Sequence, residues 1–236
     1  MEAIVLAGGF GTRLRSSVPD LPKCMAPIHG HPFLHYLIQY ATKAGIQKIV
    51  FALGYKADII IDYLQLYTSD IVFDYVIEDI PLGTGGAILN AMQKTSETHP
   101  IILNGDTFYD VDLKLLHAYH LQSQAHITIA LKPMQNFARY GAVTLDENGI
   151  VTEFAEKKPC KSGNINGGIY VIDKAWYTSL ELGAQFSFEV DVLSRNVGFD
   201  TIYGWIDDGY FIDIGIPEDF ERAQTELFQL CSESKQ

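Results

Sequence analysis

Apolar residues in the first half of the chain fall into short continuous runs that are separated by longer amphipathic segments. Short runs are typical of buried strands, whereas apolar positions three and four residues apart are typical of helices. The expected strands are Ala3–Ala7, Lys48–Leu53, Ile71–Ile77 and Ile101–Leu103, and the expected helices between them are Pro32–Ala44, Lys56–Leu66 and Gly83–Gln93. This alternation predicts an α/β fold with a Rossmann-like, mixed but mainly parallel sheet and helices on both faces.

The pattern changes after a helix expected near Asp112–Gln122. Shorter strand-like runs follow, at Ile127–Leu131, Gly141–Leu145, Val151–Phe154 and Gly168–Ile172. Asp146–Gly149 carries a hairpin turn signal between two of them. These runs predict a small antiparallel insertion on the same sheet. An amphipathic helix, Glu218–Leu230, is expected to close the chain after Pro217.

Composition and charge narrow the possible partners. The chain has 236 residues, 47% of them apolar, which is enough to build the core of one large α/β domain. The net charge of −12 argues against nucleic acid and anionic membranes as partners. Residues 1–57 nevertheless hold six Lys and Arg residues against two acids, Glu2 and Asp20. A positive region in an acidic protein suits a small anionic substrate with a bound metal.

The cysteines and histidines suggest no metal or disulfide framework. Cys24, Cys160 and Cys231 are far apart and odd in number, so a reduced, cytoplasmic compartment is expected. We expect neither a signal peptide before the first strand nor a membrane-spanning segment. The histidines fall into two groups, His29, His31 and His35, and His117 and His120, and neither group forms a metal-ligand set. His117 and His120 are expected at the surface.

A glycine-rich loop follows the first expected strand. Gly8, Gly9 and Gly11 can bring successive backbone N–H groups close to one anion, and Arg13, Arg15 and Lys23 add positive charge beside them. The loop suits a triphosphate. It is not a P-loop, because no Lys-Ser/Thr follows the last glycine, and Leu14 occupies the third glycine position of the dinucleotide fingerprint. A tight turn with solvated arginines is the alternative.

Two aspartates follow apolar runs. Asp106 comes directly after Ile101–Leu103, and Asp213 ends the apolar run that begins at Tyr210. Ligands bind at the carboxyl ends of strands in open α/β sheets, and Mg²⁺ prefers carboxylate and phosphate oxygens. The pair could therefore share Mg²⁺, although each aspartate alone also fits an ordinary turn or cap.

The segment Glu78–Ala87 joins a strand to a helix and is rich in glycine, so a flat ligand could lie against its backbone. Guanine offers two adjacent hydrogen-bond donors on its pairing edge. The carboxylate of Glu78 or Asp79 is only an acceptor, so it could accept both hydrogen bonds. Uracil or thymine would favour an amide side chain instead. An exposed loop acid remains the alternative.

Charged and polar motifs mark the antiparallel insertion. The lysine of Glu156–Lys158 could hold a sugar phosphate while its glutamate binds hydroxyls, and Asn166–Gly168 follows nearby. A solvated charge run is the alternative. Ser187 fits an ordinary helix N-cap with Glu189 as an early acid.

These motifs, in this order, resemble the sugar-1-phosphate nucleotidyltransferase family. The matching elements are LAGGFGTRL at 6–14, PK at 22–23, PLGTGGA at 81–87, NGD at 104–106, EKKP at 156–159, NGG at 166–168 and DIGIPED at 213–219. Within the family the chain is most similar to the D-glycero-D-manno-heptose 1-phosphate guanylyltransferases, on VPDLPK at 18–23, ITIALKPM at 127–134, RYGAV at 139–143 and DGYFIDIGIPEDFERAQ at 208–224.

The resemblance implies Mg²⁺-dependent transfer of a nucleotidyl group, with GTP favoured, to a sugar 1-phosphate. It implies one domain over residues 1–231, with a nucleotide-binding half at about 1–125, a sugar-phosphate-binding half at about 126–231 and a frayed tail at 232–236. The implied catalytic residues are Arg13, Lys23 and Asp106, with Asp106 and Asp213 as metal ligands. The implied nucleotide-binding residues are Leu6, Ala7, Gly8, Gly9, Gly11, Thr12, Arg13, Glu78, Pro81, Gly83, Thr84 and Gly105, and the sugar phosphate would meet Gly141, Glu156, Lys157, Asn166 and Gly168.

Two departures and several alternatives accompany this resemblance. Cys24 stands where the family commonly has proline, and Arg15–Val18 replaces its usual Pro-Leu-Thr. Mannose 1-phosphate as acceptor, or UTP, dTTP or CTP as donor, stays open, as does a nucleotide-sugar sensor without turnover. Members of the family are monomers, dimers or tetramers, so a homo-oligomer is possible.

Overall fold

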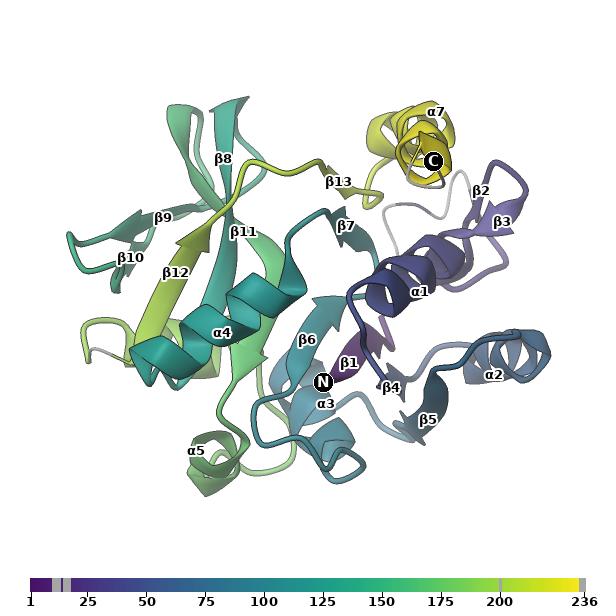
Figure 1. Ribbon diagram of the computed structural model, residues 1–236. Helices are drawn as coiled ribbons and strands as arrows, with labels where there is room; N and C mark the ends of the chain where they lie inside the picture. The colour runs from purple at the N-terminus through teal and green to yellow at the C-terminus, as the bar shows by residue number, and fades with distance from the viewer. Residues whose placement is uncertain (10–13, 15–17, 200, 234–236) are drawn as a thin grey trace.

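The computed structural model describes residues 1–9, 14, 18–199 and 201–233, the last three for their backbone only. Within these residues the main sheet has nine strands, of which seven run in the order β10-β9-β11-β6-β1-β4-β5, while β8 pairs with β11 and β12 (Figure 1). Figure 1 shows α1 and α4 on the near side of this sheet. The predicted fold class, a mixed sheet with helices on both faces, is confirmed.

Four parallel strands form the first half of the sheet. They are β1 (Glu2–Ala7), β4 (Lys48–Leu53), β5 (Val72–Ile77) and β6 (Ile101–Asn104), each within two residues of its predicted bounds. Strand β1 is central, because Ala3 pairs with Ile49 of β4 on one side and with Ile101 of β6 on the other. Helices α1 (Phe33–Lys43), α2 (Ala57–Leu66) and α3 (Gly83–Met92) lie between the strands in sequence, as predicted.

The predicted antiparallel insertion is also confirmed. Its long strands are β8 (Ile127–Phe137) and β11 (Cys160–Ile172), and its hairpin is β9 (Ala142–Leu145) with β10 (Val151–Phe154). Strand β11 pairs antiparallel with β6 and so joins the insertion to the parallel half. It begins well before the predicted strand. Its first part contains polar residues such as Asn164 and Asn166, which pair with β8 but do not form an apolar run that a sequence pattern could detect.

Several elements were missed. Strand β12 (Ile202–Ile206) pairs parallel with β8, and the short strands β7 (Thr107–Tyr109) and β13 (Phe211–Asp213) form a separate antiparallel pair. The short helices α5 (Lys174–Ser179) and α6 (Ser194–Asn196) follow β11. Before α6 lies a helix of π type (Phe188–Leu193), of which the sequence indicated only the N-cap Ser187 and the early acid Glu189. These segments are too short to show a period. Two further pieces, η2 (Lys23–Met25) and the hairpin β2 (Pro27–Ile28) with β3 (His31–Pro32), precede α1.

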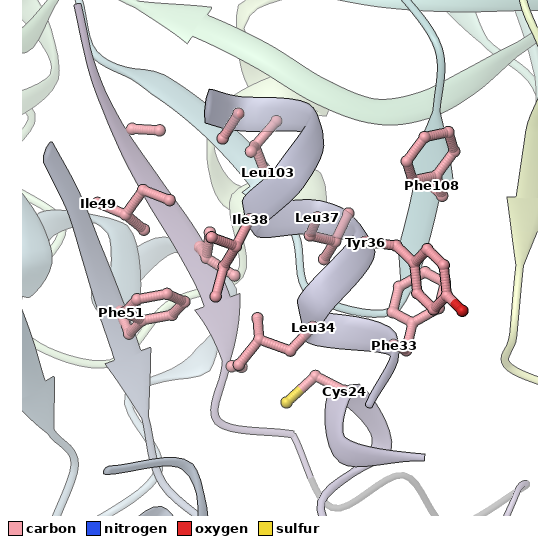
Figure 2. Packing of buried hydrophobic residues seen from close by; sticks show 14 of the residues in the cluster. Cys24, Phe33, Leu34, Tyr36, Leu37, Ile38, Ile49, Phe51, Leu103 and Phe108 are labelled. Atoms are coloured by element: carbon pink, nitrogen blue, oxygen red, sulfur yellow. The ribbon is translucent and has the colours of Figure 1, made fainter. Parts of the chain in front are cut away.

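The sheet buries a different core on each face. Alternate residues of β1 point to opposite sides, so Ala3 and Val5 belong to one apolar cluster and Ile4 to the other. On the first face, Leu34 and Ile38 of α1 pack against Ile49 and other strand residues (Figure 2). The second face is covered by α3, α5 and the π-type helix. Both cores leave the carboxyl ends of the parallel strands free to form a site.

Helix boundaries follow ordinary capping chemistry. The Asp112 carboxylate accepts the backbone N–H groups of Lys114 and Leu115 and so begins α4 (Leu113–Ser123). Gly45, with φ of 81°, follows the end of α1 as predicted. Helix α7 (Pro217–Glu233) extends past the predicted end at Leu230 into the expected tail, whose residues 234–236 lie outside the described part.

One expectation about the histidines is wrong. His120 is 1% exposed, and its Nδ1 lies 2.9 Å from the hydroxyl of buried Thr128, because its face of α4 packs on the sheet instead of facing water. His117 is half-buried and contacts the carbonyl of His99. Separately, across the residues described here, every helix is too short or too polar to span a membrane.

Candidate active site

A cavity of about 410 Å³ lies at the carboxyl ends of the parallel strands. Eleven of its lining residues are predicted site residues: Leu6, Ala7, Gly8, Gly9, Lys23, Glu78, Pro81, Gly83, Thr84, Gly105 and Asp106. The sequence reasoning missed six others as site residues: Cys24, Ala52, Ala87, Asn104, Glu189 and Gly215. Half of these carry no chemical signal in a sequence, because Ala52, Ala87 and Gly215 contribute only shape.

A lysine bridges two carboxylates at one end of this cavity. Lys23 Nζ donates to Asp106 Oδ2 at 2.5 Å and lies 3.5 Å from Asp213 Oδ1. The lysine side chain is only 12% exposed, whereas the Asp106 side chain is 39% exposed and open to the cavity. The two aspartates predicted to act together therefore lie together, although more than a hundred residues separate them in sequence.

The small β7–β13 pair produces this arrangement. Asp213 pairs with Thr107, the residue after Asp106, and Ile214 donates its backbone N–H to the Asp106 carbonyl at 3.0 Å. Asp213 Oδ1 also accepts the Gly215 N–H at 2.7 Å, which fixes the carboxylate. Lys23 enters from the turn η2, where Ala26 N–H bonds to the Lys23 carbonyl. Three segments distant in sequence thus converge on one centre.

The donor set at this centre fits Mg²⁺. Both carboxylates lie within contact distance of one ammonium group, so one compact cation can reach both. Among the described residues there is no group of three or more His, Cys, Asp and Glu side chains that could hold a metal. Two carboxylates, with the other positions left to water and phosphate oxygens, are the usual protein share of a Mg²⁺ site that handles nucleotides.

Cys24 lies next to Lys23 and lines the same cavity. Burial, with a smaller contribution from the negative charge of Asp106, raises the pKa of its thiol to about 12. The thiol therefore stays protonated at neutral pH and acts as a small neutral side chain.

Two of the site glycines are required by close backbone packing. A Cβ on Gly105 would lie 2.5 Å from the Leu6 carbonyl oxygen, and the Gly105 N–H donates to that same oxygen at 2.9 Å. Gly83 has φ of 73°, and a Cβ there would lie 2.5 Å from the Phe186 carbonyl oxygen. Both glycines let backbone segments approach closely at the cavity wall. By contrast, a Cβ on Gly9 would meet nothing within 4 Å.

Glu78 lies at the far end of the cavity from Lys23, after β5. Its Oε2 accepts the Leu82 N–H at 2.9 Å, which ties the carboxylate to the loop before α3. Burial raises the pKa of Glu78, and the Leu82 hydrogen bond partly offsets that rise. Asp79, the alternative acceptor, is exposed and lies outside the cavity lining formed by the described residues. Of these two acids, Glu78 is therefore the one that lines the cavity.

The predicted sugar-phosphate residues are less tightly assembled. Asn166 Oδ1 accepts the Gly168 N–H at 3.0 Å, and Gly168 lies against the Asn104 side chain at the cavity edge. Glu156 and Lys157 are exposed and, in the described structure, stand apart from the cavity lining. A Cβ on Gly141 would lie 2.2 Å from the Ala155 carbonyl oxygen, so the β9–β10 pairing already requires glycine there. Gly11, Thr12 and Arg13, like Arg15, lie outside the described residues.

A comparison with known proteins identifies the family. The sequence profile of the nucleotidyl transferase family matches residues 2–229. The chain belongs to this family. The match spans both the parallel strands and the antiparallel insertion, so the whole cavity lies within the family's domain.

Individual relatives in the nucleotidyl transferase family are similar over nearly the whole chain. D-glycero-alpha-D-manno-heptose 1-phosphate guanylyltransferase of Aneurinibacillus thermoaerophilus is 47% identical, over 96% of this chain and 98% of the relative. The crystal structure of HddC from Yersinia pseudotuberculosis complexed with GMP-PN has a TM-score of 0.86 and 38% identity, over 94% of this chain and 97% of that one. Mannose-1-phosphate guanylyltransferase of Mycobacterium tuberculosis is 33% identical, over 96% of this chain and 64% of the relative.

Proposed function

We propose that this protein transfers GMP from GTP to a sugar 1-phosphate, with D-glycero-D-manno-heptose 1-phosphate as the preferred acceptor, and releases pyrophosphate. One observation carries the proposal: a lysine and two aspartates meet at one end of a cavity whose other end holds a carboxylate suited to guanine. The similarity to heptose 1-phosphate guanylyltransferases supports the choice of nucleotide and sugar.

The reaction needs positioning and charge neutralisation instead of a covalent intermediate. A phosphate oxygen of the sugar 1-phosphate forms a bond to the α-phosphorus of GTP, and the bond from that phosphorus to the oxygen bridging to the β-phosphate breaks. The electron pair leaves with pyrophosphate. Lys23 Nζ, which pairs with Asp106, would neutralise the α-phosphate and the incoming phosphate together, where negative charge is most crowded in the transition state.

Asp106 and Asp213 would hold Mg²⁺, which supplies positive charge to the phosphate oxygens when bound. Gly8 and Gly9 would lie along the triphosphate, and Gly105 and Leu6 would form the floor beneath it. Arg13 follows this loop in sequence and would neutralise the leaving pyrophosphate. Thr12 and Gly11 would complete the same loop.

Guanine recognition is assigned to Glu78. One carboxylate oxygen accepts the Leu82 N–H, and the remaining acceptor positions suit the two donors on the guanine pairing edge. Pro81, Gly83 and Thr84 form the wall beside it. Burial raises the pKa of Glu78, and a bound base would bury its carboxylate further. Hydrogen bonds from two guanine donors would offset the free-energy cost of burying the charged carboxylate.

The sugar phosphate would enter from the side of β11. Asn166 and Gly168 lie at the cavity edge. The side chains of Lys157 and Glu156 are exposed and would bind the acceptor, the lysine at its phosphate and the glutamate at its hydroxyls. Gly141, in the neighbouring hairpin, would offer its backbone to the sugar.

The deciding experiment measures pyrophosphate release by the purified chain with Mg²⁺. GTP, CTP, UTP, dTTP and ATP are each combined with heptose 1-phosphate, mannose 1-phosphate and glucose 1-phosphate. Release with GTP and the heptose is expected to exceed every other pair. Preference for mannose 1-phosphate or another nucleotide would keep the reaction and change the substrate. Tight nucleotide binding without release for any pair would favour a sensor and contradict an enzyme.

A further inference from the structure

A third carboxylate faces the cavity, and the proposed reaction gives it no task. Glu189 lines the cavity together with Thr84 and Gly83. It lies in the first turn of the π-type helix, which Ser187 caps by accepting the Val190 N–H, as the sequence predicted. Glu189 is an exposed residue, and it also contributes to the cavity wall, so its carboxylate is open to a ligand that enters from solvent.

Hydrogen bonds hold the Glu189 carboxylate in place. Thr84 Oγ1 donates to Glu189 Oε2 at 2.7 Å, and Ser187 Oγ donates to the same oxygen at 3.2 Å. Thr84 Oγ1 in turn accepts the Phe188 N–H at 2.9 Å, so the threonine hydroxyl connects the two segments. Oε2 is therefore used for positioning, which leaves Oε1 available to accept a hydrogen bond from a ligand.

The backbone beneath Glu189 is locked to the start of α3. Phe186 N–H donates to the Leu82 carbonyl at 3.0 Å, and the Phe186 carbonyl accepts the N–H groups of Gly85 and Gly86 at 3.0 and 3.3 Å. Gly85 has no room for a side chain, because a Cβ there would lie 2.3 Å from the Phe186 ring. The loop that would hold the base and the segment that carries Glu189 thus form one unit.

Glu189 also lies within electrostatic range of the β11 side of the cavity. Burial raises the pKa of Tyr170, on β11, and the negative charges of Glu189 and Asp106 both add to that rise. The Tyr170 side chain hydrogen-bonds Asn166, one of the proposed sugar residues. Glu189 therefore shares the cavity with both Glu78 and Asp106, and it contacts Thr84 of the loop that would hold the base.

The chemistry of a carboxylate restricts what it can bind there. It accepts hydrogen bonds and donates none, and it repels phosphate oxygens. Hydroxyl groups of a sugar ring satisfy it, because two neighbouring hydroxyls can donate to one carboxylate. Such hydroxyls are carried both by the ribose of the nucleotide and by the acceptor sugar.

We infer that Glu189 binds a sugar hydroxyl pair in the cavity and selects hydroxylated substrates, a role that rests on the proposed guanylyl transfer. Thr84 and Ser187 act as positioning residues for it. The ribose and the acceptor sugar share this chemistry, and the substrate comparisons below distinguish them.

The test is the isosteric variant Glu189→Gln, compared with wild type and with the control Glu181→Gln. Glu181 is an exposed acid in the same connection, so its replacement removes the same charge away from the cavity. The KM of one hydroxyl-bearing substrate is expected to rise about tenfold or more in Glu189→Gln, as expected for loss of a charge-assisted hydrogen bond, with a smaller change in kcat. Glu181→Gln should match wild type.

Deoxy substrates identify the source of the hydroxyls. If the ribose is bound, wild type should discriminate against 2′-deoxy-GTP or 3′-deoxy-GTP, and Glu189→Gln should lose that discrimination. If the acceptor is bound, the same loss should occur between a sugar 1-phosphate and its deoxy forms. Unchanged discrimination in both comparisons would overturn the inference. So would selective loss of the preference for GTP over ITP, because Glu189 would then read the base.

A binding measurement separates this inference from the reaction. Calorimetric titration of GTP and of the sugar 1-phosphate into wild type and Glu189→Gln needs no turnover. Weaker binding of a hydroxylated ligand in the variant would support the inference even if no pyrophosphate were released. Equal binding by the two proteins, with equal thermal stability, would overturn it even if the proposed transfer were confirmed.

Discussion

The two ends of strand β6 hold ionisable groups in opposite ways. At its carboxyl end, Asp106 faces an open cavity and shares Lys23 with Asp213. At its amino end, His99, His117 and His120 pack together, and the His120 ring is buried with its Nε2 unbonded among the described residues. One end keeps its charges exposed to a ligand, and the other buries the His120 ring, where burial lowers the pKa of the imidazole.

This contrast shows why a residue type alone does not mark a site. The aspartates lie where backbone strands end and the sheet offers a crevice, so their charges can be neutralised by a substrate or a cation. His117 and His120 lie where helix α4 packs on the sheet, and burial lowers the pKa of both because it makes their charged form costly. The ends of β6 should therefore respond differently to mutation, with activity lost at one end and stability at the other.

The largest effect is expected for Asp106→Asn. The amide keeps the shape but removes the charge that would hold Mg²⁺, so kcat should fall by about a thousandfold or more. The fold should persist, because the Asp106 side chain is partly exposed and its main structural bond is the Ile214 N–H to its own carbonyl. Pyrophosphate release measures the fall in kcat, and circular dichroism measures whether the fold persists. Near-normal Mg²⁺-dependent release would remove Asp106 from the metal site.

A smaller effect is expected for Lys23→Ala. Its contact with the phosphates should strengthen in the transition state, so kcat should drop by about a hundredfold while the KM for GTP changes less. Lys94→Ala provides the control, because Lys94 pairs with Asp74 away from the cavity. Steady-state kinetics of both variants test the difference. A rise in KM at unchanged kcat would instead mean that Lys23 binds the ground state and the transition state equally well.

The other end of β6 should show its effect in stability. Burial lowers the pKa of His120 to about 3, below its ordinary value, so its stabilising effect is complete above about pH 6.5. As the pH falls from 6.5 towards 3, the unfolded chain binds a proton that the folded chain does not, and stability declines. At pH 5 the loss is about 2 kcal/mol.

Urea unfolding at pH 7.5 and pH 5 measures this loss. His120→Asn keeps a polar group of similar size without the titration, so it should flatten the acid decline while lowering stability at both pH values. An acid decline of the same size in this variant would assign it to other groups. Transfer activity at pH 7.5 should persist in the folded fraction, because His120 lies at the opposite end of β6 from Asp106.

The sequence predicted the carboxyl end of β6 much better than the amino end. Asp106, Lys23 and Gly105 lie in or next to motifs that follow apolar runs, and the rule that ligands bind at the carboxyl ends of strands places them together. The position of Asp213 beside Asp106 depends on the pairing of β13 with β7, and both strands are too short to be predicted from a sequence pattern. Its position was still predicted, because it also ends an apolar run.

The remaining errors have physical causes. His120 was expected at the surface because the apolar pattern of α4 is weak, and only the packing of α4 on β8 and β12 buries it. Glu189 was taken as a simple first-turn acid, because nothing local shows that Thr84 will contact it from more than a hundred residues away. Such contacts depend on how loops meet in space, which hydrophobic periodicity does not encode.

The smallest expected effect concerns the choice of base at the cavity end opposite Lys23. Glu78→Gln keeps an acceptor for the Leu82 N–H but presents a donor to one of the guanine donors. The ratio of kcat/KM for GTP to that for UTP should therefore fall by about tenfold, mostly through the KM for GTP. The nearby variant Asp79→Asn is the matched control, because Asp79 is exposed beside the same loop and should leave the ratio unchanged. An unchanged ratio in Glu78→Gln, or a change only in Asp79→Asn, would show that guanine is recognised by other groups.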